Sequence, residues 1–413
     1  MSGDFRSRPG GARPPPLPKF GHEVSVNAES QSRPIAFFDM KAQQALIRGA
    51  IDAGIARVLD HGRFIQGPEV DELERRLAEF AGVAHAVGVS SGTDALQIAL
   101  MAEGIGPGDA VFLPAFTYTA TAEVALVLGA TPVFVDVEEA SFNLDMADLA
   151  RRLALVEREG RLRPRAVIGV DLYGRPADWP AILRLCESRG MFALDDAAQA
   201  FGGALHDKRL GAWGQATALS FYPTKTLGCY GDGGALLTDD AGKAELYRSL
   251  RTHGEGKTRY EVMRTGMNAR LDSIQAAILL PKLGLLEQEL AAREKVAGWY
   301  AARLGGRVQP GQQRFHVGIG HGRAAGGRLA GRAPQVGEDA AALVRLGAGV
   351  VFDHQAQAVA RVAVLVQVQP HRLGRALDRG GANVARIDDA VVQRRCRHVD
   401  AVVRGIHLLV AQA

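Results

Sequence analysis

The stretch SFYPTKTLGCYGDGG, residues 220–234, places a single lysine, Lys225, between an apolar run that ends at Ser220 and a loop crowded with glycine. A lysine in such a place can hold a phosphate or form a covalent bond through its amine. A phosphate-binding P-loop requires GxxxxGK[ST], and the residues before Lys225 are SFYPT, so the sequence argues against a nucleotide-phosphate site. A lysine shortly after a strand fits instead an amine that forms a Schiff base with an aldehyde cofactor.

The residues around this stretch predict an α/β fold. Short apolar runs alternate with amphipathic segments such as 94–104 and 179–190, which we expect to be helices. The runs predicted to be strands buried on both faces are 86–90, 110–114, 132–137, 166–174, 192–196, 216–222 and 234–238. This alternation is typical of a doubly wound, mostly parallel sheet with helices on both faces. A long helix is expected over 271–304, with a kink at Pro281.

Two strand-to-helix turns carry candidate binding residues. In SSGTDAL, residues 90–96, Gly92 and the Thr93 hydroxyl come where a helix begins, so they could face an anion, although a plain helix cap is the alternative. In PAFTYTATAEV, residues 114–124, Tyr118 could stack on a flat ring at the carboxyl end of a strand, or it could be a core tyrosine.

The segment FALDDAAQAFGG, residues 192–203, ends an apolar strand in two carboxylates. A buried Asp196 needs a positively charged partner or several hydrogen-bond donors, and a protonated pyridine nitrogen would serve. A metal is the weaker alternative, because no histidine or third carboxylate has suitable spacing nearby. Pyridoxal phosphate needs a lysine, an aspartate opposite the ring nitrogen, a phosphate site and usually a stacking aromatic, and all four are present.

Composition limits the class of protein. The chain has 413 residues, 47% hydrophobic and 23% charged, as globular proteins do. No apolar run reaches the ~20 residues of a membrane span, so we expect a cytoplasmic protein. The three cysteines, Cys186, Cys229 and Cys396, lack paired spacing and are interpreted as reduced thiols, with neither disulfide nor metal site.

We divide the chain into a flexible extension (1–34), a cofactor-binding large domain (35–305) and an aberrant C-terminal region (306–413) in place of a small domain. From Ala301 onward there are 16 Arg but no Lys, Ser, Thr, Met, Trp or Tyr. Loss of so many residue types is atypical of a folded domain, and we interpret the region as translated in a shifted frame. A folded lobe of biased composition is the alternative. Because the basic surplus is confined to this tail, nucleic-acid binding is disfavoured.

The large domain resembles the DegT/StrS-type pyridoxal-phosphate sugar aminotransferases. The matching segments between about Ala36 and Leu304 are FFDMKAQ, HGRFIQGPEVDELE, SSGTDALQIAL, PAFTYTATAE, PVFVDVEEASFNLD, DDAAQAFGG, SFYPTKTLGCYGDGGA, THGEG and MNARLDSIQAAILLPKL. The resemblance implies the fold of aspartate aminotransferase (fold type I) and a homodimer with shared active sites.

Residue by residue, the resemblance implies that Lys225 bonds the cofactor and moves the proton, and that Asp196 holds the ring nitrogen protonated. The remaining implied roles are Gln199 at the ring oxygen, Tyr118 stacked on the ring, Gly92, Thr93 and Ser220 at the phosphate, and Asn268 at the phosphate of the neighbouring subunit. His253 and Arg270 are candidates for the sugar or its carboxylate, with structural ion pairs as the alternative. Relatives with histidine in place of the lysine are dehydratases, so Lys225 favours transamination.

The segments GCYGDGGA, AAILLPKL and FFDMKAQQ look most like enzymes that use glutamate to aminate the 3-keto group of a UDP-linked N-acetylglucosaminuronic acid, on a route to bacterial surface polysaccharides such as O-antigen lipopolysaccharide. Other UDP- or dTDP-linked keto-sugars stay open. The aromatic and proline-rich motif of the family's C-terminal lobe is missing, so an inactive family member is a further alternative.

Overall fold

The computed structural model describes residues 39–256, 258 and 260–304. Within them, one sheet has the strand order β1-β9-β8-β5-β4-β2-β3, in which β9 runs antiparallel to both its neighbours and the other pairs are parallel. The strands are β1 (His85–Val89), β2 (Asp109–Pro114), β3 (Thr131–Val135), β4 (Arg163–Val170), β5 (Phe192–Asp196), β8 (Ala216–Ser220) and β9 (Gly234–Thr238), and β6 (Ala204–Leu205) pairs with β7 (Lys208–Arg209) outside this sheet.

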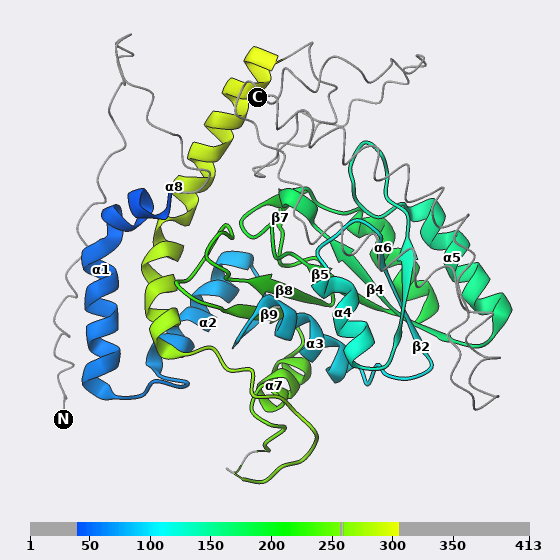
Figure 1. Ribbon diagram of the computed structural model, residues 1–413, viewed down its shortest axis with the longest axis horizontal. Coiled ribbons are helices and arrows are strands. Elements are labelled where there is room, and N and C mark those ends of the chain that lie inside the picture. The colour runs from blue at the N-terminus through cyan, green and yellow to red at the C-terminus, as the bar shows by residue number, and fades with distance from the viewer. Residues whose placement is uncertain (1–38, 257, 259, 305–413) are drawn as a thin grey trace, which may run out of the picture.

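Helices cover both faces of the sheet (Figure 1). They are α1 (Met40–His61), α2 (Pro68–Ala81), α3 (Gly92–Ala102), α4 (Ala120–Val127), α5 (Met146–Glu159), η1 (Leu172–Gly174), α6 (Trp179–Arg189), α7 (Ala241–Leu250) and α8 (Ser273–Leu304). Helices α2, α5, α6 and α8 share one apolar cluster with the sheet, and α3, α4 and α7 share the other. In Figure 1, α1 lies alongside α8 at the edge of this layered body.

The strands are apolar throughout because each face contributes to a different cluster. Along β5, Ala193 packs in the cluster of α2, α5, α6 and α8, whereas Phe192 and Leu194 pack in the cluster of α3, α4 and α7. Side chains alternate between the two faces of a strand. Asp195 and Asp196, which end the strand, therefore point to opposite sides of the sheet.

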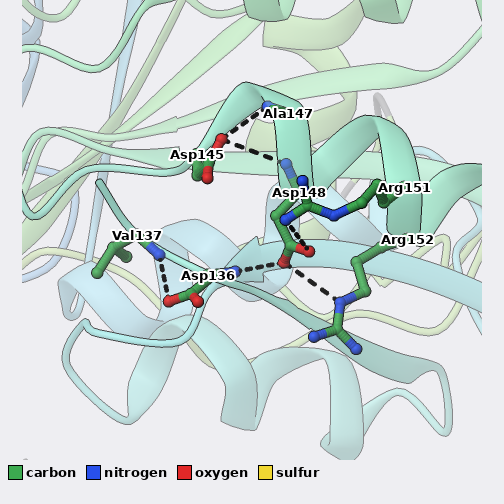
Figure 2. Close-up of polar contacts among 7 residues, drawn as sticks. All are labelled: Asp136, Val137, Asp145, Ala147, Asp148, Arg151 and Arg152. Atoms are coloured by element: carbon green, nitrogen blue, oxygen red, sulfur yellow. Dashed lines mark hydrogen bonds and ion pairs between the residues drawn. The ribbon is translucent and has the colours of Figure 1, made fainter. Parts of the chain in front are cut away.

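The start of α5 shows how a helix is tied to the edge of the sheet (Figure 2). Asp145 caps the helix by accepting bonds from the N–H groups of Ala147 and Asp148 at 2.7 and 3.2 Å. The buried carboxylate of Asp148 accepts the N–H of Asp136, which follows β3, at 2.7 Å, and it pairs with Arg151 and Arg152 at 3.0 and 3.2 Å. Side-chain caps of this kind satisfy first-turn N–H groups that have no partner within the helix.

The predicted α/β sheet is confirmed, but the expected strand over 166–174 is wrong at its end. Strand β4 stops at Val170, and the chain turns because the buried Asp171 carboxylate accepts the N–H of Ala177 at 2.8 Å and the indole N–H of Trp179 at 2.9 Å. The run 216–222 likewise ends as a strand at Ser220. Helix α8 continues through Pro281. The expected extension 1–34 and the C-terminal region 306–413 lie outside the described residues.

Three further expectations concern the chain as a whole. No helix among the described residues has the length and apolarity to cross a membrane. Cys186 and Cys229 are buried free thiols, and Cys396 lies outside the described part. Within residues 39–304, apart from positions 257 and 259, no group of three or more His, Cys, Asp or Glu side chains is arranged to hold a metal ion.

Candidate active site

Asp196 stands at the carboxyl end of β5, with 6% of its surface exposed. Its Oδ2 accepts the Thr121 hydroxyl of α4 at 2.8 Å, and its Oδ1 accepts the N–H of Ala198 at 3.3 Å. Burial raises the pKa of Asp196, while these two bonds and the charge of Lys225 oppose that rise. The carboxylate is thus held in place by donors on both oxygens and is near a cation.

Lys225 follows β8, the strand hydrogen-bonded to β5, and its backbone N–H bonds to the carbonyl of Tyr222 at 2.8 Å. Burial lowers the pKa of Lys225, and Asp196 opposes that shift. A lysine with a lowered pKa is more often in its neutral, nucleophilic form. The structure therefore brings together the two residues on which the sequence prediction depended most.

The predicted phosphate residues also meet. The N-terminus of α3 is at Gly92, and a Cβ on Gly92 would come within 2.7 Å of the Ser220 Cβ, so only a glycine lets the two segments approach this closely. Ser91 caps the helix through its Oγ, which accepts the N–H of Asp94 at 3.0 Å. The first-turn N–H groups of a helix lack intrahelical partners and favour anions. Gly92, Thr93 and Ser220 thus lie where a phosphate could be held.

Two further predicted residues lie near the same edge of the sheet. Tyr118 is 48% exposed in the turn between β2 and α4. Gln199 follows β5, and its side-chain oxygen accepts the N–H of Tyr173 at 2.7 Å. Tyr173 has a positive φ of 56° in the turn after β4. The amide group of Gln199 is thereby oriented by the same turn that Asp171 stabilises.

The residues proposed for the neighbouring subunit and the sugar lie on two chain segments that are paired with each other, around Thr252 and Asn268. Asn268 is exposed, and its backbone forms an isolated antiparallel bridge with that of Thr252. The backbone of Arg270 forms a similar bridge with Val89 at the end of β1. His253 and Arg270 line a pocket of about 640 Å³, which neither Lys225 nor Asp196 lines. Among the described residues, the buried Nε of Arg270 has no hydrogen-bond partner. The segment that carries Asn268 and Arg270 also borders the predicted phosphate residues, because the N–H of Ser90 bonds to the carbonyl of Ala269 at 3.0 Å.

Sequence reasoning missed several contributors. Thr121 bonds Asp196, and its hydroxyl lies 3.0 Å from that of Thr117, yet only Tyr118 was selected from this segment. The spacing of two threonines, four apart at the start of a helix, was the available signal. Asp171 is a third buried carboxylate: its charge raises the pKa of Asp195, and the charge of Asp196 raises the pKa of Asp171. Asp171 lies 25 positions before Asp196 in the sequence, so spacing along the chain did not indicate that the two residues are neighbours.

These residues fit pyridoxal 5′-phosphate. The ring nitrogen requires a buried carboxylate, the aldehyde a lysine, and the phosphate a helix N-terminus that approaches closely. Asp196, Lys225 and the contact of Gly92 with Ser220 meet these three requirements.

Comparison with known proteins decides the family. The model of the DegT/DnrJ/EryC1/StrS aminotransferase family matches residues 46–345. The chain belongs to this family. It is 49% identical over 270 residues to the UDP-2-acetamido-2-deoxy-3-oxo-D-glucuronate aminotransferase of Pseudomonas aeruginosa, a match that covers 65% of this chain and 73% of the relative. The resemblance expected from the motifs is confirmed.

Solved structures agree with the fold. The crystal structure of a family aminotransferase from Brucella abortus matches with a TM-score of 0.65 at 49% identity, over 65% of this chain and 72% of that chain. DesV of S. venezuelae, in complex with a ketimine intermediate, matches with a TM-score of 0.62 at 42% identity, over 66% and 71% of the two chains. The chain is an aminotransferase of the pyridoxal-phosphate-dependent fold, as its sequence predicts.

Proposed function

We propose that this aminotransferase moves an amino group from glutamate to the 3-keto group of a UDP-linked N-acetylglucosaminuronic acid, for bacterial surface polysaccharides. The observation that carries the assignment of the site is the placement of the buried Asp196 at the carboxyl end of β5 and of Lys225 in the loop after the adjacent parallel strand β8, where the charge of each acts on the other. The proposed identity of the sugar is based on the 49% sequence identity to the Pseudomonas aeruginosa relative. Other nucleotide-linked keto-sugars are the alternative.

Each predicted residue has a part in this proposal. When bound, the cofactor supplies an electron-withdrawing ring that stabilises negative charge on a substrate carbon. Asp196 keeps a carboxylate beside the ring nitrogen and so stabilises a proton there. Gly92, Thr93 and Ser220 hold the phosphate, Gln199 bonds the ring oxygen, and Tyr118 packs on the ring.

Lys225 performs the proton transfer in this proposal. With the cofactor bound, the Lys225 amine would take a proton from the α-carbon of the amino donor and would return it at the neighbouring carbon of the cofactor. Burial lowers its pKa, which increases the share of neutral amine that can act as the base. The negative charge of Asp196 limits the decrease in the Lys225 pKa.

The pocket of His253 and Arg270 is proposed to receive the sugar or its carboxylate once a second subunit completes the site. The cation of Arg270, with its unpartnered Nε among the described residues, supports that role. Asn268 is exposed, which fits a contact with the phosphate of the other subunit. We propose a homodimer that works in the cytoplasm.

The test is the absorption spectrum of the purified full chain with pyridoxal phosphate, before and after glutamate. We expect a visible band that glutamate bleaches, and a loss of roughly 10²- to 10⁴-fold in the bleaching rate for Lys225→Ala. Lys208→Ala is the control, because Lys208 is an exposed lysine of β7 that lies over the ring of Trp213 and has no part in the proposed site. A band that survives unchanged in Lys225→Ala would overturn the assignment of Lys225. A wild-type chain without any band would favour the inactive family member.

A further inference from the structure

A second buried lysine lies beneath the loop that carries Lys225. Lys282 of α8 has 2% of its surface exposed, and its Nζ donates to the carbonyl oxygen of Gly228 at 2.6 Å. The same nitrogen lies 4.4 Å from the centre of the Tyr230 ring. No carboxylate of the described residues forms an ion pair with it. Because a buried ammonium is costly without partners, these two contacts indicate a specific role.

The carbonyl that Lys282 binds belongs to the turn around Lys225. Gly228 follows Lys225 by three residues, and a Cβ there would lie 2.4 Å from the carbonyl oxygen of Pro223. The backbone after Lys225 is thus folded directly against the backbone before it. An anchor on Gly228 therefore fixes both ends of the turn.

Other bonds complete the attachment of this loop. The side-chain oxygen of Gln275, also on α8, accepts the N–H of Tyr230 at 2.9 Å. Gln275 and Lys282 are seven positions apart, about two turns, so they share one face of the helix. From inside the loop, the Cys229 thiol donates to the carbonyls of Phe221 at 3.0 Å and Gly231 at 3.1 Å.

We propose that Lys282 is a positioning residue for the Lys225 amine, because it anchors the 221–233 loop to α8 through the carbonyl oxygen of Gly228. The inference rests on the proposed role of Lys225 as the reacting amine. An amine at the end of a four-carbon side chain can stay beside Asp196 only when its backbone is fixed. The helix, which also packs in the core through Leu279 and Leu283, supplies that rigid support.

The charges around Lys282 agree with an ammonium anchor at neutral pH. Burial lowers the pKa of Lys282 to about 8, and Cys229 and Glu289 oppose the shift. From the loop, Asp232 acts on Cys229, and from α1, Arg48 acts on Tyr230. Below pH 8 most of the molecules keep the cation that the carbonyl and the ring stabilise.

The first test uses Cys229 as a reporter of the loop in protein without cofactor. The rate of its alkylation by iodoacetamide, measured by peptide mass spectrometry, is expected to rise at least ~10-fold in Lys282→Met, because the loop opens locally. Lys243→Met is the matched control: this lysine also lies over an aromatic ring, Phe192, but on α7. Its Cys229 rate should equal that of the wild type. Gln275→Leu gives a second variant in case Lys282→Met fails to fold.

The second test separates positioning from mere loop stability. In enzyme loaded with pyridoxal phosphate, the rate of bleaching by glutamate should fall roughly 10-fold in Lys282→Met and in Gln275→Leu, with the glutamate concentration at half-maximal rate little changed. Unchanged Cys229 rates in folded variants, or exposed Cys229 with an unchanged bleaching rate, would overturn the proposal. A wild type that binds the cofactor but ignores glutamate would count against the proposed function, while the Cys229 rates would still decide whether the anchor exists.

Discussion

Thr121 is one of three groups that favour the ionised form of the buried Asp196 carboxylate. Its hydroxyl donates to Asp196 Oδ2 at 2.8 Å, and this bond lowers a pKa that burial raises. Thr121→Val should raise the pKa of Asp196 further, because a bond to a charged group contributes about 1.5 kcal/mol, or ~1 pKa unit. We expect the acid limb of the rate profile with glutamate to move up by ~1 pH unit and the rate at neutral pH to fall.

Thr119→Val is the control for that measurement. Thr119 stands two residues earlier at the start of α4, and its side chain makes no capping hydrogen bond. Its acid limb should match that of the wild type. An unshifted limb in Thr121→Val would show that the Ala198 N–H and Lys225 suffice to keep Asp196 ionised.

The contrast between Asp196 and Thr121 explains what the sequence could predict at the level of residues. Asp196 ends β5 and Lys225 lies in the loop five residues after the end of β8, so the strand pattern and the residue types together indicated both. Thr121 and Asp171 both contact Asp196, from which they are separated by 75 and 25 positions along the chain. Only the sheet order, with β4 next to β5, brings Asp171 into that neighbourhood.

At the level of elements, the start of α5 depends on one buried carboxylate. Burial alone would raise the pKa of Asp148, but the Asp136 N–H, Arg152 and Arg151 together lower it. Asp148→Asn should reduce the free energy of unfolding by about 1–3 kcal/mol, measured by urea denaturation at pH 7. Because the pKa in the folded state is lowered, the contribution is present above pH ~4 and is lost as the pH falls further.

Arg151→Gln tests whether the exposed donor Arg151 or the buried acceptor Asp148 contributes more to the free energy of unfolding. The Arg151 side chain is 66% exposed, against 6% for Asp148, so its loss should cost under ~1 kcal/mol. Equal losses for both variants would contradict the view that burial of Asp148 makes the cluster costly to break. Neither change should alter the bleaching by glutamate per folded molecule.

Strand identities followed from the sequence because both faces of this sheet are covered, so that apolar runs mark each strand. The ends of the strands were predicted from the sequence less accurately than their positions. Strand β4 ends at Val170 because Asp171 bonds Ala177 and Trp179, which lie beyond the apolar run. The alternation of residues could not reveal that a carboxylate within an apolar stretch would redirect the backbone.

For the whole molecule, the buried acids behind the site make stability depend on pH. Asp171 and Asp195 are fully buried, and each has one oxygen without a hydrogen-bond partner among the described residues. Burial raises the pKa of Asp171 to about 7, with Asp196 adding to the rise, and burial raises that of Asp195 as well. Their side chains lie on the face of the sheet opposite that of Asp196, so neutral forms there leave Asp196 as the carboxylate that faces Lys225.

The sign of the effect follows from the protons that each state binds. An unfolded aspartate titrates near pH ~4, so between pH 4 and about 7 the folded protein retains a proton on Asp171 that the unfolded chain has lost. The stabilising contribution is full below pH ~4, decreases as the pH rises through this window and is lost above it. The free energy of unfolding of the protein without cofactor should therefore fall by on the order of 2–4 kcal/mol between pH 5 and pH 8.

Asp171→Asn should flatten this decrease, because asparagine keeps an oxygen for the Ala177 and Trp179 donors but carries no titrating proton. Asp60→Asn, an exposed change on α1, should leave the slope as in the wild type. Urea denaturation at several pH values between 5 and 8 gives all three slopes. An unchanged slope in Asp171→Asn would mean that Asp171 is ionised in the folded protein over this range, and it would assign the dependence to Asp195 or to other groups.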